Sequence, residues 1–79
     1  MSEPFTLSAS MRAALSDLRL GPLDRQRRYF VAAAGGRHQV QVLQALERRE
    51  LAIIKATGFR RARARITRDG ARLFAEVLR

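Results

Sequence analysis

The most distinctive chemistry in this 79-residue sequence is a row of arginines, Arg61, Arg63 and Arg65, which alternate with alanines. Side chains alternate between the two faces of a β-strand, so a strand here places the three guanidinium groups on one face, about 6.7 Å apart. Arginine forms bidentate hydrogen bonds with phosphate and with guanine. The row therefore favours a face that binds a polyanion. The alternative is a solvated strand whose charges protect a sheet edge from aggregation.

The net charge of the whole chain points in the same direction. The 16 Lys and Arg residues outnumber the 7 Asp and Glu residues, which gives a formal charge of +9 and a pI of about 11.8. A charge of this size attracts nucleic acid, an anionic membrane or an acidic protein surface. Apolar residues make up 47% of the sequence, which is typical of a folded domain and too many for a disordered basic tail.

Residues that could carry out catalysis or bind a metal are scarce. The chain has no cysteine and a single histidine, His38, which excludes disulfides, thiolate metal sites and cysteine nucleophiles. Its carboxylates are scattered along the sequence. We therefore expect no metal, no cofactor and no enzymatic activity. No apolar run approaches the length of a membrane span, and the first residues do not resemble a signal peptide, so we expect a cytoplasmic protein without a membrane partner.

The first half of the sequence predicts one helix and one ambiguous segment. Residues 1–6 are expected to form a short arm, and residues 7–79 a single domain. Ser8 or Ser10 can cap a helix that runs to about residue 18 or 19, and Gly21-Pro22 ends it. The apolar stripe of this helix comprises Leu7, Met11, Leu15 and Leu18. Residues 24–36 fit a short helix or a strand at 28–32, and the β-favouring run Tyr29-Phe30-Val31 makes the strand the preferred interpretation.

The second half predicts a helix, a hairpin and a final helix. Residues 38–50 contain no Gly or Pro, and Val42, Leu43 and Leu46 recur at helical spacing. The pattern then changes to a period of two, which predicts strands at 52–56 and 61–66 joined by a turn at 57–60. Thr67 can cap a last helix over 68–78. The sequence therefore predicts an α+β fold with three helices and a two- to three-stranded antiparallel sheet.

The order of these elements resembles the carboxy-terminal half of a winged helix-turn-helix DNA-binding domain of the MarR-like kind. The resemblance covers about residues 40–78 and rests on two segments. The first is the helix end Leu46-Glu47-Arg48-Arg49-Glu50-Leu51, and the second, after the basic hairpin, is Ile66-Thr67-Arg68-Asp69-Gly70-Ala71-Arg72. There are two departures: Glu50 stands where such helices usually have glycine, and residues 24–36 do not read as the usual first helix of the pair.

The resemblance implies a transcriptional regulator or accessory factor that binds double-stranded DNA and is associated with the nucleoid. Residues 38–50 would be the recognition helix and residues 52–66 the wing. The candidates for reading base edges in the major groove would be Arg37, Gln41 and Gln44. In the wing, phosphates or the minor groove would be contacted by Arg60, Arg61 and Arg63. The implied DNA-contacting residues are Arg37, His38, Gln41, Gln44, Arg48, Lys55, Arg60, Arg61, Arg63 and Arg65.

Three alternatives remain open at this point. A small basic winged helix could instead bind an acidic protein surface, for example as an inhibitor of a nucleic-acid enzyme. RNA binding is a weaker alternative, because Tyr29 and Phe30 are adjacent and would lie on opposite faces of a strand. A homodimer is a further alternative, because Leu7, Met11, Phe74 and Leu78 could exceed what one small core buries.

Overall fold

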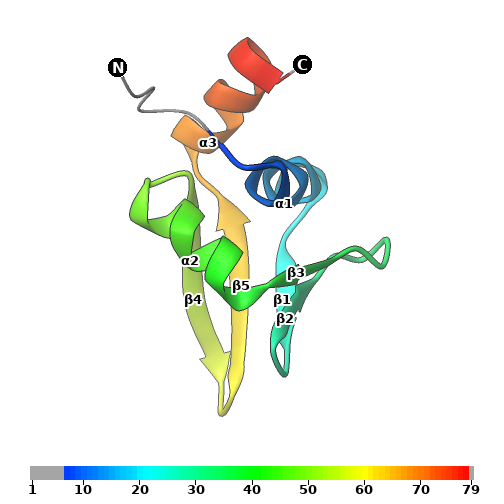
Figure 1. The fold of residues 1–79 in the computed structure, drawn as a ribbon. Coiled ribbons are helices and arrows are strands. Elements are labelled where there is room, and N and C mark those ends of the chain that lie inside the picture. The colour runs from blue at the N-terminus through cyan, green and yellow to red at the C-terminus, as the bar shows by residue number, and fades with distance from the viewer. Residues whose placement is uncertain (1–6, 79) are drawn as a thin grey trace.

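Residues 7–78, which the computed structural model describes, form an α+β fold with three helices and one antiparallel sheet (Figure 1). The elements follow one another as α1 (Ala9–Leu20), β1 (Leu23–Gln26), β2 (Tyr29–Val31), β3 (Arg37–Gln39), α2 (Val40–Arg48), β4 (Ala52–Gly58), β5 (Arg61–Ile66) and α3 (Arg68–Leu73), which continues as the π-helical segment η1 (Phe74–Leu78). The arm expected at residues 1–6 lies outside the described residues.

Two helices begin at the capping hydroxyls that the sequence provides. The Ser8 hydroxyl oxygen accepts a hydrogen bond from the Met11 amide at 3.1 Å, at the start of α1. The Thr67 hydroxyl oxygen accepts one from the Gly70 amide at 3.0 Å, at the start of α3. Each bond satisfies one of the amides that the first turn of a helix leaves without a partner. The predicted starts of these two helices are confirmed.

The sheet has five strands in the order β3-β2-β1-β5-β4, and every neighbouring pair is antiparallel. The prediction of two or three strands was wrong, although the strand expected at 28–32 is confirmed as β2. The residues of β1 that follow Leu23 have low strand propensity. They form a strand because β1 pairs with β2 on one side and β5 on the other, and because Leu23 is fully buried.

The prediction that a helix begins at about residue 38 was also wrong. Arg37 and His38 belong to β3, which pairs with β2, and α2 starts at Val40. His38 lies directly opposite the buried Phe30, and its Nε2 atom is 2.6 Å from an Asp17 carboxylate oxygen on α1. These long-range contacts hold residues 37–39 in an extended conformation, and local sequence patterns do not reveal them.

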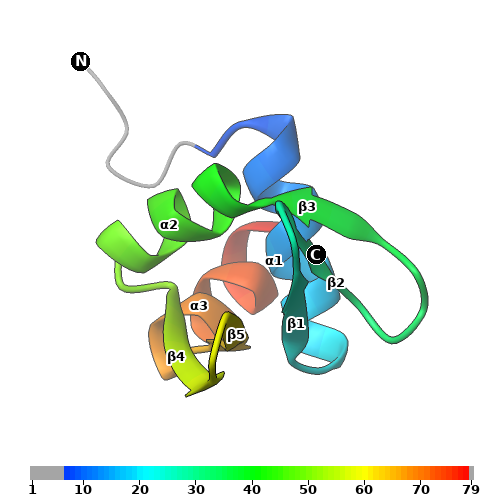
Figure 2. The same cartoon turned by 90° about the horizontal axis from the view of Figure 1, so that it is seen from below.

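The helices pack on one face of the sheet, which we call the inner face. Figure 2 shows the strands following a curve from β4 through β5, β1 and β2 to β3, with α1 inside it. Helix α2 connects the two edge strands, β3 and β4. The core contains Leu15 and Leu18 of α1, Leu43 and Leu46 of α2, and Leu23, Phe30 and Ala64 of the sheet. The opposite face of the sheet is the outer face.

Most of the described apolar residues that suggested a homodimer are buried in this chain's own core. Leu7 is 9% exposed and Met11 is 8% exposed, so both belong to this chain's own core. Phe74 is partly buried against the same core, and the guanidinium of Arg19 lies 4.8 Å from the centre of its ring. The side chain of Leu78 lies outside the described residues. Leu7, Met11 and Phe74 therefore give no separate reason to expect a dimer.

The turn between α2 and β4 adopts a backbone conformation that normally favours glycine. Glu50, which stands where winged-helix sequences usually have glycine, has a φ of +62°. The Thr67 hydroxyl donates a hydrogen bond to the Glu50 carbonyl at 2.7 Å, and the Thr67 amide donates to the Leu51 carbonyl at 3.1 Å. A Cβ at Gly70 would collide with the Leu51 carbonyl oxygen. This close approach docks the start of α3 on the turn and requires glycine at position 70.

Candidate nucleic-acid interface

Nearly all of the net charge lies in the strands and their turns. Residues 23–39 and 52–66 hold nine of the 16 Lys and Arg residues and one of the seven Asp and Glu residues, so they carry +8 of the formal +9. The rest of the sequence is close to neutral. The field that attracts polyanions therefore originates from the sheet and not from the helices.

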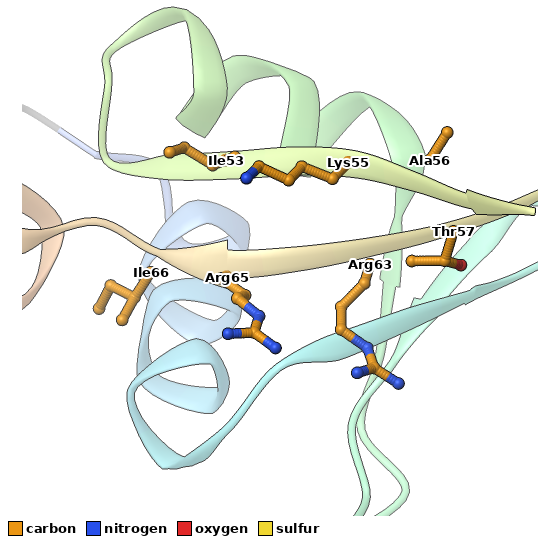
Figure 3. Close-up of a pocket in the computed structure, with 7 residues that line it drawn as sticks. All are labelled: Ile53, Lys55, Ala56, Thr57, Arg63, Arg65 and Ile66. Atoms are coloured by element: carbon orange, nitrogen blue, oxygen red, sulfur yellow. The ribbon is translucent and has the colours of Figure 1, made fainter.

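The row of arginines on β5 occupies the outer face of the sheet. Arg63 lies opposite Lys55 on β4, and Arg65 lies opposite Ile53. Figure 3 shows Arg63 and Arg65 extending to the same side of β5, away from β4, while Lys55 lies along β4. Ala64 points to the inner face, where it is fully buried. The predicted alternation is confirmed, and we call the outer-face group of Lys55, Arg61, Arg63 and Arg65 the basic face.

The basic face contains an open hollow of about 500 Å³ between β4 and β5 (Figure 3). Its lining combines cationic groups with short apolar and hydroxyl side chains. The lining residues are Ile53, Lys55, Ala56, Thr57, Arg63, Arg65 and Ile66. The hollow offers charged hydrogen-bond donors beside apolar side chains. This combination suits the phosphates and sugars of a nucleic-acid backbone better than a buried small molecule.

One carboxylate, that of Asp24 on β1, lies beside the basic face. The Nε atom of Arg63 donates a hydrogen bond to this carboxylate at 2.8 Å, and both side chains are about half exposed. Among the described residues, Lys55, Arg61 and Arg65 pair with no carboxylate. Neighbouring like charges repel one another, so the free energy of this face falls when a polyanion covers it.

Arginines also occupy the two hairpin turns at one end of the molecule. The β1–β2 turn consists of Arg27 and Arg28, and the β4–β5 turn consists of Phe59 and Arg60. Figure 1 shows both turns at the end of the molecule opposite α3. Arg27 has a φ of +59° and Arg60 a φ of +58°. Residues other than glycine and asparagine rarely adopt this backbone conformation. Each turn therefore holds an arginine where glycine would be less strained.

The outer face carries one further cation towards β3. The Arg37 guanidinium lies 5.9 Å from the centre of the Tyr29 ring, and Tyr29 is 38% exposed. Tyr29 faces the opposite side of β2 from the buried Phe30, as expected for adjacent strand residues. A second open hollow, of about 750 Å³, is lined by Gln26, Arg27, Arg28, Tyr29, Val31 and Arg37. Basic and aromatic groups thus extend across the outer face beyond β5.

Of the residues implied as base-reading, Arg37 lies on the outer face, whereas Gln41 and Gln44 are exposed on α2. Helix α2 packs on the inner face through Leu43 and Leu46, so Gln44 and the exposed Arg48 lie on the side of the molecule opposite the basic face. Gln41, at the start of α2, lines an open hollow with Arg25, Arg28 and Tyr29. His38 is 10% exposed and bonded to Asp17, which removes it from the surface that a ligand would contact.

The expected DNA-contacting residues therefore separate into two groups. Lys55, Arg61, Arg63 and Arg65 lie together, with Arg60 at the adjoining turn and Arg37 further along the outer face. Sequence reasoning missed Arg27, Arg28 and Tyr29, although the run Arg27-Arg28-Tyr29 is a visible combination of basic and aromatic residues. It also missed Phe59, an apolar residue in a predicted turn.

Comparison with protein-family models, with curated proteins and with solved structures finds no match to this chain. In the part of the chain that the structure describes, no helix is long and apolar enough to cross a membrane. Within the same residues, no three His, Asp or Glu side chains are grouped so that they could hold a metal ion. Inference about function therefore rests on the residues of the site.

Proposed function

We propose that this chain is a small DNA-binding domain that holds duplex DNA against the basic face of its sheet. The observation that carries the proposal is the concentration of +8 of the formal +9 charge in the strands and their turns, with the arginines of β5 sharing one exposed face. Lys and Arg side chains that neutralise phosphates release counterions, which supplies the sequence-independent part of DNA affinity.

The residues proposed to contact phosphates are the basic face and the adjoining turn. Arg61 and Arg65 pair with no carboxylate within residues 7–78, whereas Arg63 has to exchange its bond with Asp24 for one with phosphate. Arginine can bind phosphate in a bidentate manner, which fixes the position of the backbone as well as attracting it. The basic face and Arg60 together provide five cations.

We also propose that the fold is that of a winged helix-turn-helix domain. The succession of α2, the basic hairpin and α3 supports it. The usual use of that fold, with the helix and the wing on one duplex, has less support, because Gln44 and Arg48 lie on the opposite side of the molecule from the basic face. We therefore assign the affinity to the wing and no base contact to Gln44.

Measurement of duplex DNA affinity against salt concentration tests the proposal. For about five to six phosphate contacts, the logarithm of the affinity should fall with the logarithm of the salt concentration with a slope of about −4 to −6. The double variant Arg61→Ala/Arg63→Ala should weaken binding to all sequences and make the slope shallower by about 2.

The matched control removes two arginines from the helices, as Arg12→Ala/Arg72→Ala, which lowers the net charge by the same amount. Both are exposed residues of α1 and α3. An equal loss of affinity in both double variants would mean that net charge alone attracts DNA. A flat salt response of the unmodified chain would contradict DNA binding, and an acidic protein retained by the chain after nuclease treatment would then favour a protein partner.

A further inference from the structure

We propose that Phe59 is a wedge that enters between base pairs of bound duplex DNA and unstacks them; this inference rests on the proposed function. The wedge would act from the minor groove, with the β4–β5 turn pointing into the duplex. Apolar side chains that enter a base step in this way kink the duplex and allow it to contact more protein surface.

Phe59 is the most exposed large apolar residue that the structure describes. It is 88% exposed, whereas Phe30, in the core, is 1% exposed. Every residue from Lys55 to Arg61 is exposed as well, so the end of the hairpin projects beyond the core and beyond the helices (Figure 1). The ring of Phe59 therefore lies outside the core of this chain, and a groove could receive it.

The residues of this turn do not favour the turn itself. Two-residue hairpin turns are normally formed by Asn-Gly, Asp-Gly or Gly-containing pairs, because these residues tolerate a positive φ. Here the pair is Phe59-Arg60, and Arg60 has a φ of +58°. The strained residue is Arg60, directly beside the exposed ring, and strained backbone is often found at functional sites.

The charges around Phe59 select nucleic acid as its partner. The Arg60 guanidinium lies 5.2 Å from the centre of the Phe59 ring, and Arg61 follows directly at the start of β5. No carboxylate lies between residues 52 and 66. Phosphates on either side of a base step could pair with these two arginines while the ring enters the step, so an apolar tip framed by cations matches the composition of a DNA groove.

A comparison of matched and mismatched duplexes tests the wedge. Unstacking costs less at a mismatch than in a fully paired duplex, so a protein that unstacks bases binds the mismatched duplex more tightly. The unmodified chain should prefer a duplex with one central mismatch by about tenfold, which corresponds to about 1.4 kcal/mol. It should also shorten the end-to-end distance of a fluorescently labelled matched duplex.

Three variants separate the wedge from a general loss of apolar surface. Phe59→Ala should keep the salt-dependent binding of matched duplex but lose the mismatch preference and the bending. Phe59→Leu should retain both, because leucine also serves as a wedge. Leu20→Ala removes another exposed apolar side chain, at the end of α1, where Leu20 is 77% exposed, and should change neither property.

The outcomes distinguish failure of the wedge from failure of the proposed function. Salt-dependent binding without a mismatch preference, or a preference that Phe59→Ala leaves unchanged, would overturn the wedge and leave DNA binding intact. Absence of salt-dependent binding to either duplex would overturn both. Binding to vesicles of anionic phospholipid that depends on Phe59, without binding to duplex, would show that the exposed ring enters a membrane and would also overturn the proposal.

Discussion

At the scale of single residues, the ion pair between Arg63 and Asp24 distinguishes Arg63 from its neighbours. The pair is half exposed, and its 2.8 Å contact is with the one carboxylate on the outer face. Exposed pairs of this kind contribute at most about 1 kcal/mol to stability. If the chain binds DNA as proposed, Asp24 repels an approaching phosphate and occupies Arg63 until the phosphate replaces it.

Asp24→Asn should therefore strengthen duplex binding. Removal of the carboxylate releases Arg63 and deletes one repulsive charge, which should raise the affinity at low salt by up to about fivefold. Titration of labelled duplex into each variant measures the change. Glu76→Gln in η1 removes one negative charge at the other end of the molecule and should have a smaller effect. Equal effects of both substitutions would contradict a local contact at Arg63.

At the scale of the elements, the connection from α2 to β4 stores backbone strain. Glu50 adopts a φ of +62° where glycine is unstrained, and the bonds from Thr67 to the carbonyls of Glu50 and Leu51 hold the turn against α3. A residue with a side chain in the left-handed region costs about 1–2 kcal/mol. The packing of α2 and α3 compensates for this cost.

Glu50→Gly should stabilise the fold. Relief of the strain outweighs the greater freedom of glycine in the unfolded chain, so the free energy of unfolding should rise by about 1 kcal/mol in urea denaturation. Gln44→Gly, at an exposed position inside α2, provides the control and should lower it by about 1 kcal/mol, because helical φ gives glycine no advantage. A loss of stability in Glu50→Gly would show that the Glu50 side chain itself stabilises the turn.

The elements that the sequence predicted are those that depend on local signals. Ser8 and Thr67 mark two helix starts through their own hydroxyls, and the alternation around Arg63 defines its strand without reference to the rest of the chain. Strand β3 depends instead on His38 meeting Asp17 on α1 and Phe30 on β2, which are distant in the sequence. Its residues have no strong preference for strand or helix, so tertiary contacts determine its conformation.

At the scale of the whole molecule, the cations of the basic face and helix α2 lie on opposite faces of the sheet. The sequence predicted which side chains on β5 share a face, but it could not show that α2 packs on the other face of the sheet. That depends on Leu43 and Leu46 meeting Ala64 and Phe30 in one core. Gln44 and Arg63 therefore belong to different surfaces, and the proposed binding site consists of the basic face and the adjoining turn.

Mapping of backbone amide chemical shifts during titration with duplex DNA tests directly whether DNA binds to the basic face. We predict that the largest shifts occur at Lys55, Arg63 and Arg65 and in the two hairpin turns, whereas the amides of Gln44 and Arg48 remain unchanged. Shifts concentrated on the exposed side of α2, with β4 and β5 unaffected, would contradict it.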